Sequence, residues 1–185
     1  MATRKTSTRK SSSSAARSRA AARIARATST KRGVANVPKG TTNTEGAIRG
    51  GNGKYQFTLA EVKEIPAGTG YSTSHGGVVE GERMLVGYIH KPRGTGSRMH
   101  THKNEQFNYV VRGTLVGSVN GKRIVAPAGT LIYIPANAPH TLVASPTDED
   151  VIFIAIKDLS QGIIGTAVDG TMTGPHYDPG FGPDS

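Results

Sequence analysis

Cysteine is absent from this chain of 185 residues. Disulfides, thiolate metal sites and a cysteine nucleophile are therefore excluded, and any bound metal must be held by nitrogen and oxygen ligands. No apolar run reaches transmembrane length, and no secretory apolar core follows the N-terminus. Neither a phosphate-binding glycine loop before a helix nor a serine nucleophile elbow is present.

Acidic residues are missing from one part of the chain. Residues 1–40 hold eleven Lys and Arg and no Asp or Glu, whereas the remainder holds 12 basic and all 13 acidic residues. The net charge of +10 therefore belongs to the N-terminal segment, and residues 41–185 carry a net charge of −1.

Residues 1–40 consist mainly of Ser, Thr, Ala, Arg and Lys. Such a segment cannot bury enough apolar surface to offset its ordering entropy, so we predict disorder. Three interpretations remain open: a solvated extension, an arm that binds nucleic acid non-specifically, and an organelle transit peptide. The protein is expected in the cytoplasm, or in an organelle if the segment is a cleaved leader, and no membrane partner is expected.

After a linker at 41–53, short segments with period-two alternation replace the basic segment. Turn residues separate them, and the pair Asn120-Gly121 predicts a tight hairpin because both residues favour positive φ. This rhythm, with no helical stretches between the strands, predicts an all-β sandwich or barrel. We predict a tail and linker at 1–53, a barrel at 54–160 and a Gly/Pro-rich tail with little structure at 161–185. The expected strands cover residues 55–65, 82–90, 97–102, 106–113, 114–120, 122–127, 130–135, 140–145 and 151–159.

Two of the six histidines lie in the stretch HTHKNEQFNYVVRG, residues 100–113. In a strand, residues two apart project from the same face, so His100 and His102 should point together, with Arg98 beside them. Two imidazoles on one face can share a metal if neighbouring strands supply further ligands.

Two stretches of the sequence resemble the paired motifs of the cupin superfamily. The first motif is Gly-x5-His-x-His-x3-(Glu or Gln)-x6-Gly, and the second is Gly-x5-Pro-x-Gly followed by a Pro and a His. They are met by Gly94, His100, His102, Gln106 and Gly113, and by Gly121, Pro127, Gly129, Pro135 and His140. The resemblance implies a double-stranded β-helix (a jelly-roll barrel), a homodimer and one divalent metal per chain.

The resemblance further implies that His100, His102, Gln106 and His140 hold this metal. The family usually has an acidic ligand where this chain has Gln106. Glu105 is the alternative ligand if a β-bulge exchanges the faces to which residues 105 and 106 point. Three imidazoles and an amide would leave the full double charge on the ion and make it a stronger Lewis acid. Fe, Mn, Ni and Zn all suit such ligands.

Arg98 and Glu105 are the candidate catalytic residues, Arg98 because its planar fork could anchor a substrate carboxylate. Two functions are weighed. The first is a metal-dependent enzyme acting on a small oxygenated substrate by dioxygenase, decarboxylase, lyase or isomerase chemistry. The second is a non-catalytic sensor or ligand-binding cupin whose residues 1–40 bind nucleic acid. The retained ligand positions favour the enzyme, but one fold hosts many chemistries.

Overall fold

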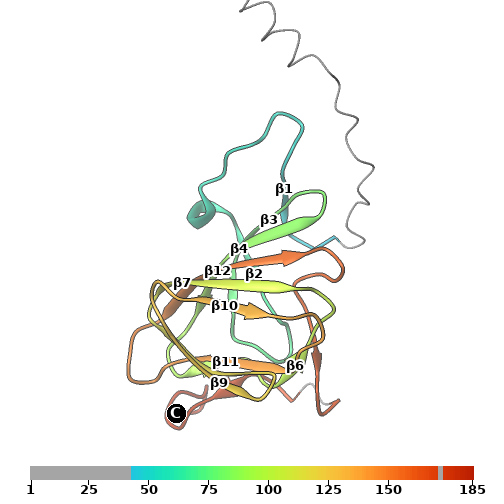
Figure 1. Ribbon diagram of the computed structural model, residues 1–185. Coiled ribbons are helices and arrows are strands. Elements are labelled where there is room, and N and C mark those ends of the chain that lie inside the picture. Colours follow the sequence, from blue (N-terminus) through green and yellow to red (C-terminus); the bar gives the residue numbers. More distant parts are fainter. Residues whose placement is uncertain (1–42, 171–172) are drawn as a thin grey trace, which may run out of the picture. The chain divides into compact units, whose positions relative to one another are not determined.

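The computed structural model describes residues 43–170 and 173–185, which form two β-sheets of seven strands each packed face to face (Figure 1). The predicted all-β fold is confirmed. The segment 1–40, for which disorder is predicted, lies outside the described residues. Within the described part of the chain, no helix is long and apolar enough to cross a membrane.

The first sheet is built around a long antiparallel pair, β4 (Met84–Lys91) and β12 (Val151–Asp158), and follows the order β1-β3-β4-β12-β7-β10. Strand β2 pairs with β3 off this path. The other strands of this sheet are β1 (Ile48–Arg49), β2 (Glu64–Pro66), β3 (His75–Glu80), β7 (Gln106–Arg112) and β10 (Leu131–Ile134).

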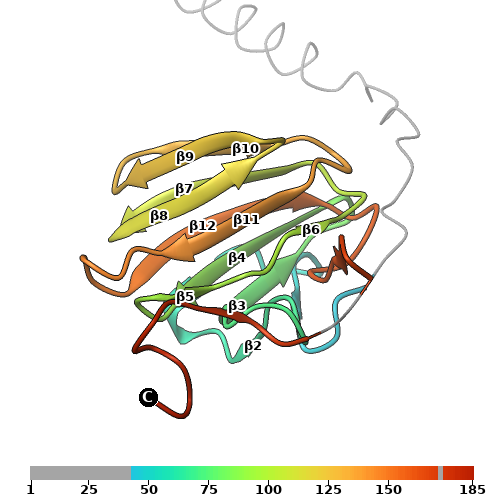
Figure 2. The same ribbon diagram turned by 90° about the horizontal axis from the view of Figure 1, so that it is seen from below.

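The second sheet is organised around β11 (His140–Ala144), which pairs with β5, β6 and β8. Figure 2 shows β9, β8 and β11 side by side, in agreement with their pairing. The remaining members are β5 (Thr95–Gly96), β6 (His100–Thr101), β8 (Thr114–Val119), β9 (Lys122–Pro127), β13 (Thr166–Ala167) and β14 (His176–Tyr177).

The hairpin between β8 and β9 confirms the turn prediction. Asn120 and Gly121 have φ values of 49° and 76°, and they join the paired residues Val119 and Lys122. Positive φ at both positions matches the twist of the flanking strands. Here a local sequence signal determines the register of a whole strand pair.

Three sequence expectations differ from the structure. Residues 55–65 contain a single 3₁₀ turn (Leu59–Glu61) and the start of β2, so no continuous strand covers them. Strand β3, which lies inside the first sheet, is absent from the expected set because Gly76 and Gly77 weaken its strand pattern. The Gly/Pro-rich end of the chain supplies β13 and β14, which pair with β6 and β5.

Glycines in β3 are required by close approach of other segments. A Cβ at Gly76 would lie 2.0 Å from the Tyr88 carbonyl oxygen, and one at Gly77 would lie 2.7 Å from the Val62 side chain. Both distances are too short for non-bonded atoms, so only glycine fits at either position. Gly76 and Gly77 weaken the sequence pattern of β3, and they also allow β3 to pack closely against the Tyr88 backbone and Val62.

The core lies between the two sheets and is formed by the inward residues of the alternating strands. In β4 and β12 alternate residues are buried, among them Leu85, Ile89, Phe153 and Ala155. The same inward parity continues to Lys91 and Lys157 at the strand ends, and these lysines are also buried. The core thus grades into a polar region at these positions.

The predicted linker is attached to the first sheet by a buried carboxylate. Glu80, at the end of β3, is fully buried; its Oε1 accepts a hydrogen bond from the Thr44 backbone N–H at 2.8 Å, and its Oε2 lies 3.0 Å from Arg49 Nη2. Arg49 belongs to β1, which runs parallel to β3. The charge of Glu80 is therefore satisfied only when residues 44–49 are in place.

We expect Glu80→Ala to lower the free energy of unfolding by about 2 kcal/mol, because it removes the buried carboxylate that pairs with the half-exposed Arg49 and leaves the Thr44 backbone N–H without its acceptor. Urea unfolding followed by circular dichroism measures the change. Glu61→Ala, at an exposed carboxylate, is the control. Equal stability of the two variants would show that Glu80 does not hold this segment.

Candidate metal centre

Three histidines converge between the sheets. His100 lies in β6 and His140 opens β11, and the two are direct antiparallel partners. His102 follows β6, and all three side chains are buried. One ring nitrogen from each lies within 4.8 Å of those of the other two. The group could hold a metal ion, as the spacing of the histidines predicts.

Each imidazole is oriented by a backbone carbonyl two residues away. Nδ1 of His100, His102 and His140 lies 2.8, 3.0 and 2.9 Å from the carbonyl oxygens of residues 98, 104 and 138. A carbonyl can only accept, so Nδ1 carries the proton and Nε2 keeps its lone pair. A backbone carbonyl that fixes the tautomer is the usual support of a metal-binding histidine.

The buried Nε2 of His102 has no hydrogen-bond partner among the described residues. An orphaned acceptor of this kind is costly unless a ligand satisfies it, and a metal ion would do so. Burial is the main cause that lowers the pKa of His100 to about 2, of His102 to about 3 and of His140 to about 4. The three imidazoles are therefore neutral at physiological pH, the state that binds metal.

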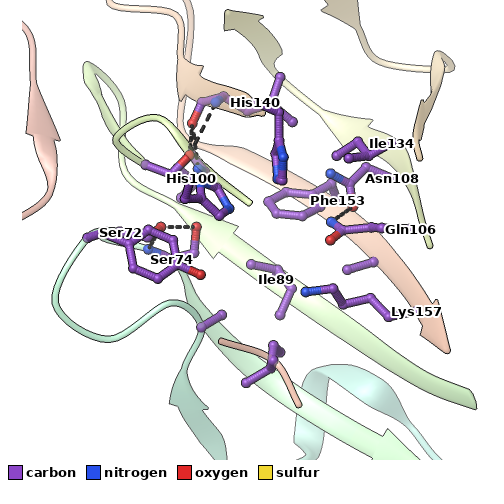
Figure 3. Close-up of a pocket in the computed structure, with 17 residues that line it drawn as sticks. Ser72, Ser74, Ile89, His100, Gln106, Asn108, Ile134, His140, Phe153 and Lys157 are labelled. Atoms are coloured by element: carbon purple, nitrogen blue, oxygen red, sulfur yellow. Dashed lines mark hydrogen bonds between the residues drawn. The ribbon is translucent and has the colours of Figure 1, made fainter. Parts of the chain in front are cut away.

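Gln106 and Glu105 lie on opposite faces of the same chain segment. Gln106 is buried, its Nε2 donates to Asn108 Oδ1 at 2.6 Å, and its side chain also interacts with His102 (Figure 3). Glu105 is exposed and accepts a hydrogen bond from the Tyr133 hydroxyl at 2.8 Å. The structure thus brings the glutamine, and not the glutamate, to the histidine side.

Next to the histidines is a small cavity of about 60 Å³. Figure 3 shows His100, His140, Gln106 and Lys157 around this space, with Ile89 and Phe153 among its apolar walls. Its lining also includes Tyr71, Ser72, Ser74 and Lys91. Convergent polar groups beside apolar walls are typical of a small-molecule site.

Sequence analysis missed several polar residues of this cavity, among them Tyr71, Lys91 and Lys157. The Tyr71 ring lies 4.4 Å from the His100 ring, and burial raises the pKa of its phenol well above the usual range. Nζ of Lys91 donates to the Leu142 carbonyl oxygen at 2.7 Å. Burial lowers the pKa of Lys91 to about 7 and of Lys157 to about 8. Lys157 therefore remains mainly an ammonium at neutral pH.

Arg98 does not reach the cavity. The chain bends at Met99 instead of continuing as a strand from 97 to 102, so the common face expected for Arg98 and the histidines is wrong. Arg98 is exposed, and its Nε donates to the Gly174 carbonyl oxygen at 2.8 Å. A substrate carboxylate in the cavity would need a different cation.

Taken together, the sandwich, the neutral three-histidine cluster and the adjoining cavity define a class of β-sandwich proteins able to hold a metal beside a small-molecule pocket. Residues 87–157 match the family model that describes the cupin domain. Over these residues, which run from β4 to β12, the chain is similar to cupin domains.

The fold is similar to several solved structures. One is an RmlC-like cupin from Shewanella frigidimarina NCIMB 400, with 22% identity, a TM-score of 0.46 and coverage of 57% of this chain and 90% of that one. A second is KdgF from Halomonas sp., with 20% identity, a TM-score of 0.46 and coverage of 55% of this chain and 91% of that one. A third is the polyketide cyclase RemF from Streptomyces resistomycificus, with 18% identity, a TM-score of 0.48 and coverage of 57% of this chain and 79% of that one. No curated protein sequence matches the chain.

Proposed function

We propose that the protein is a metal-dependent cupin enzyme that acts on a small oxygenated organic molecule. The observation that carries the proposal is the orientation of three neutral, buried imidazoles by backbone carbonyls, with the Nε2 of His102 left without a partner. Most buried polar atoms in proteins have a hydrogen-bond partner, so a ligand explains this acceptor better than packing alone does.

In this proposal the Nε2 atoms of His100, His102 and His140 and the amide oxygen of Gln106 hold one divalent ion, Fe, Mn, Ni or Zn. When bound, the ion supplies Lewis-acid stabilisation of negative charge that develops on a substrate oxygen. Asn108 orients the Gln106 amide through its hydrogen bond of 2.6 Å. None of these four ligands is an anion, so the charge of the ion is not offset by the protein.

The remaining polar groups of the cavity would act on the substrate itself. Tyr71, packed on His100, holds a proton firmly and can donate a hydrogen bond to a substrate oxygen. Lys157 supplies positive charge, and the apolar walls exclude water, which strengthens each polar contact. Dioxygenase, decarboxylase, lyase and isomerase reactions all use such surroundings, and the choice among them is left to substrate screening.

Metal content tests this function. We expect about one metal ion per chain in the wild type purified without chelator, and less than about one tenth of that in His102→Ala, because loss of one of three imidazoles cripples the site. Plasma mass spectrometry measures both. His75→Ala, which removes an exposed histidine, is the matched control and should keep its metal.

The proposed function is rejected if the folded wild type takes up none of the four metals when each is supplied in excess. The metal found also directs the substrate screen, which begins with oxygen uptake if the metal is iron.

The separation of charge along the sequence favours a second candidate, a ligand-binding cupin that is attached to nucleic acid by residues 1–40. Eleven basic residues with no acidic residue among them could neutralise phosphates without reading bases. Both candidates share the cavity and differ in the use of the basic segment. The homodimer stays a prediction, which analytical ultracentrifugation would test.

A further inference from the structure

The cavity beside the histidines is lined by basic side chains and by no acidic one. Among the described residues, none of the 17 that line it is Asp or Glu, whereas two are lysines. Lysine is almost never fully buried without a partner, because its charge is costly to desolvate. The charge of a bound metal ion would add to this excess. An anionic ligand would offset it.

The two lysines are not equivalent. Lys91 is held in place by its hydrogen bond to the Leu142 carbonyl oxygen. Lys157 is only 4% exposed, no hydrogen bond of its Nζ is found among the described residues, and burial lowers the pKa of its ammonium more than the adjacent Asp158 carboxylate raises it. Figure 3 shows its side chain extending in among the residues that line the cavity, with the nitrogen at its inner end. A buried, unpartnered ammonium aimed into a cavity lacks the acceptor that a ligand would bring.

Lys157 is also close to the candidate metal ligands. It is the cross-strand partner of Gln106, and its charge acts on both His102 and His140. A ligand that places one oxygen at the histidines and Gln106 would therefore have its neighbouring atoms within reach of Lys157. This location is the one that sequence analysis assigned to Arg98.

We infer that the cavity binds a compact organic acid whose carboxylate pairs with the Lys157 ammonium while its other end faces the histidines. This inference names the substrate class and, in its second half, rests on the proposed function. A carboxylate offers several acceptor positions to a charged donor, and the apolar walls of Ile89 and Phe153 strengthen the pair. At the 10–15 Å³ that one water needs, a cavity of about 60 Å³ holds roughly four to six non-hydrogen atoms.

Lactate is a suitable probe because it has six non-hydrogen atoms, and lactamide is its uncharged counterpart. Binding to the full-length protein is followed by NMR, with the side-chain amide signals of Gln106 and Asn108 as reporters, so that lactate held by residues 1–40 does not contribute. We expect lactate to bind at least about tenfold more tightly than lactamide, since the charge-assisted pair is lost with the amide.

Lys157→Met should weaken lactate binding at least about tenfold while keeping the volume of the side chain. Lys157→Gln serves if the methionine variant does not fold. Lys122→Met, at an exposed lysine of the β8–β9 hairpin, is the matched control and should bind as the wild type does. Equal affinity for lactate and lactamide, or unchanged lactate binding in the Lys157 variants, would overturn the inference.

The titration is done on metal-free and on metal-loaded protein, which separates this inference from the proposed function. Lysine-dependent lactate binding by a protein that takes up no metal supports the anion site and rejects the metalloenzyme. If the protein binds its metal in full and its lactate affinity is the same with and without Lys157, the anion site is rejected and the metalloenzyme proposal is retained.

Discussion

The metal-free protein should lose stability steeply as the pH falls from about 7 to about 5. The reason is the burial that lowers the pKa of His100, His102 and His140 to about 2, 3 and 4. In the unfolded chain these imidazoles take up protons below their ordinary pKa of about 6.5, whereas in the folded protein they remain neutral. The unfolded state therefore binds more protons in this pH range, and the free energy of unfolding falls.

The expected effect is large. Between about pH 6.5 and pH 5, each histidine costs about 2 kcal/mol and the three together about 6 kcal/mol. This is comparable with the whole stability of an ordinary domain, about 5–15 kcal/mol. The loss begins near the unfolded pKa and ends as the pH passes the lowered folded values. Acid should thus unfold the protein well before its surface carboxylates are protonated.

Urea unfolding of the metal-free protein at a series of pH values measures this dependence. His140→Gln, which removes one of the three histidines, should make it shallower by about one proton. His90→Gln, at a partly exposed histidine on the outer face of β4, should leave it unchanged. Stability that is the same at both ends of the range would mean that the cluster is protonated in the folded state.

The fold was largely predictable because its local signals agree with one another. Alternation marks β4, β7, β8, β9, β10, β11 and β12, and turn residues such as Asn120 and Gly121 separate them. The histidine cluster was predictable for a similar reason. His100 and His102 share one short segment, and the second motif brings His140 to the strand opposite.

The missed features depend on contacts distant in sequence. Gly76 weakens the strand pattern of β3 and is required by the Tyr88 backbone, which no local pattern shows. Arg98 is turned away by a bend at a position where alternation would continue a strand. Tyr71 precedes β3 in a loop and has no periodic signal. In each case tertiary packing overrides the local preference.

The buried lysines did leave a signal in the sequence. Lys157 shares strand parity with Phe153 and Ala155, and Lys91 shares it with Leu85 and Ile89. Parity alone predicts that both side chains point inward. The ordinary preference of lysine for solvent argues against this, so a lysine on an apolar face marks either a strand end or a ligand site. The structure shows that both positions are buried.

If residues 1–40 bind nucleic acid, as the second candidate function requires, their deletion should abolish that binding and leave the metal centre intact. The deletion removes eleven basic residues and no acidic one, so the net charge changes from +10 to −1. Residues 39–185 form a compact unit of their own, and the histidine cluster and cavity lie entirely within it. We therefore expect metal content and lactate binding to be unchanged in the shortened protein.

Fluorescence anisotropy with a labelled DNA duplex measures the effect. If six to ten of the basic residues contact phosphates, affinity of the full-length protein should fall by about 10³ to 10⁵ between about 50 and about 200 mM salt. The affinity should not depend on base sequence, because the segment has no aromatic residue to stack on bases. The shortened protein should show no binding even at low salt. DNA binding that survives the deletion would instead assign it to residues 41–185, whose net charge of −1 gives no reason to expect it.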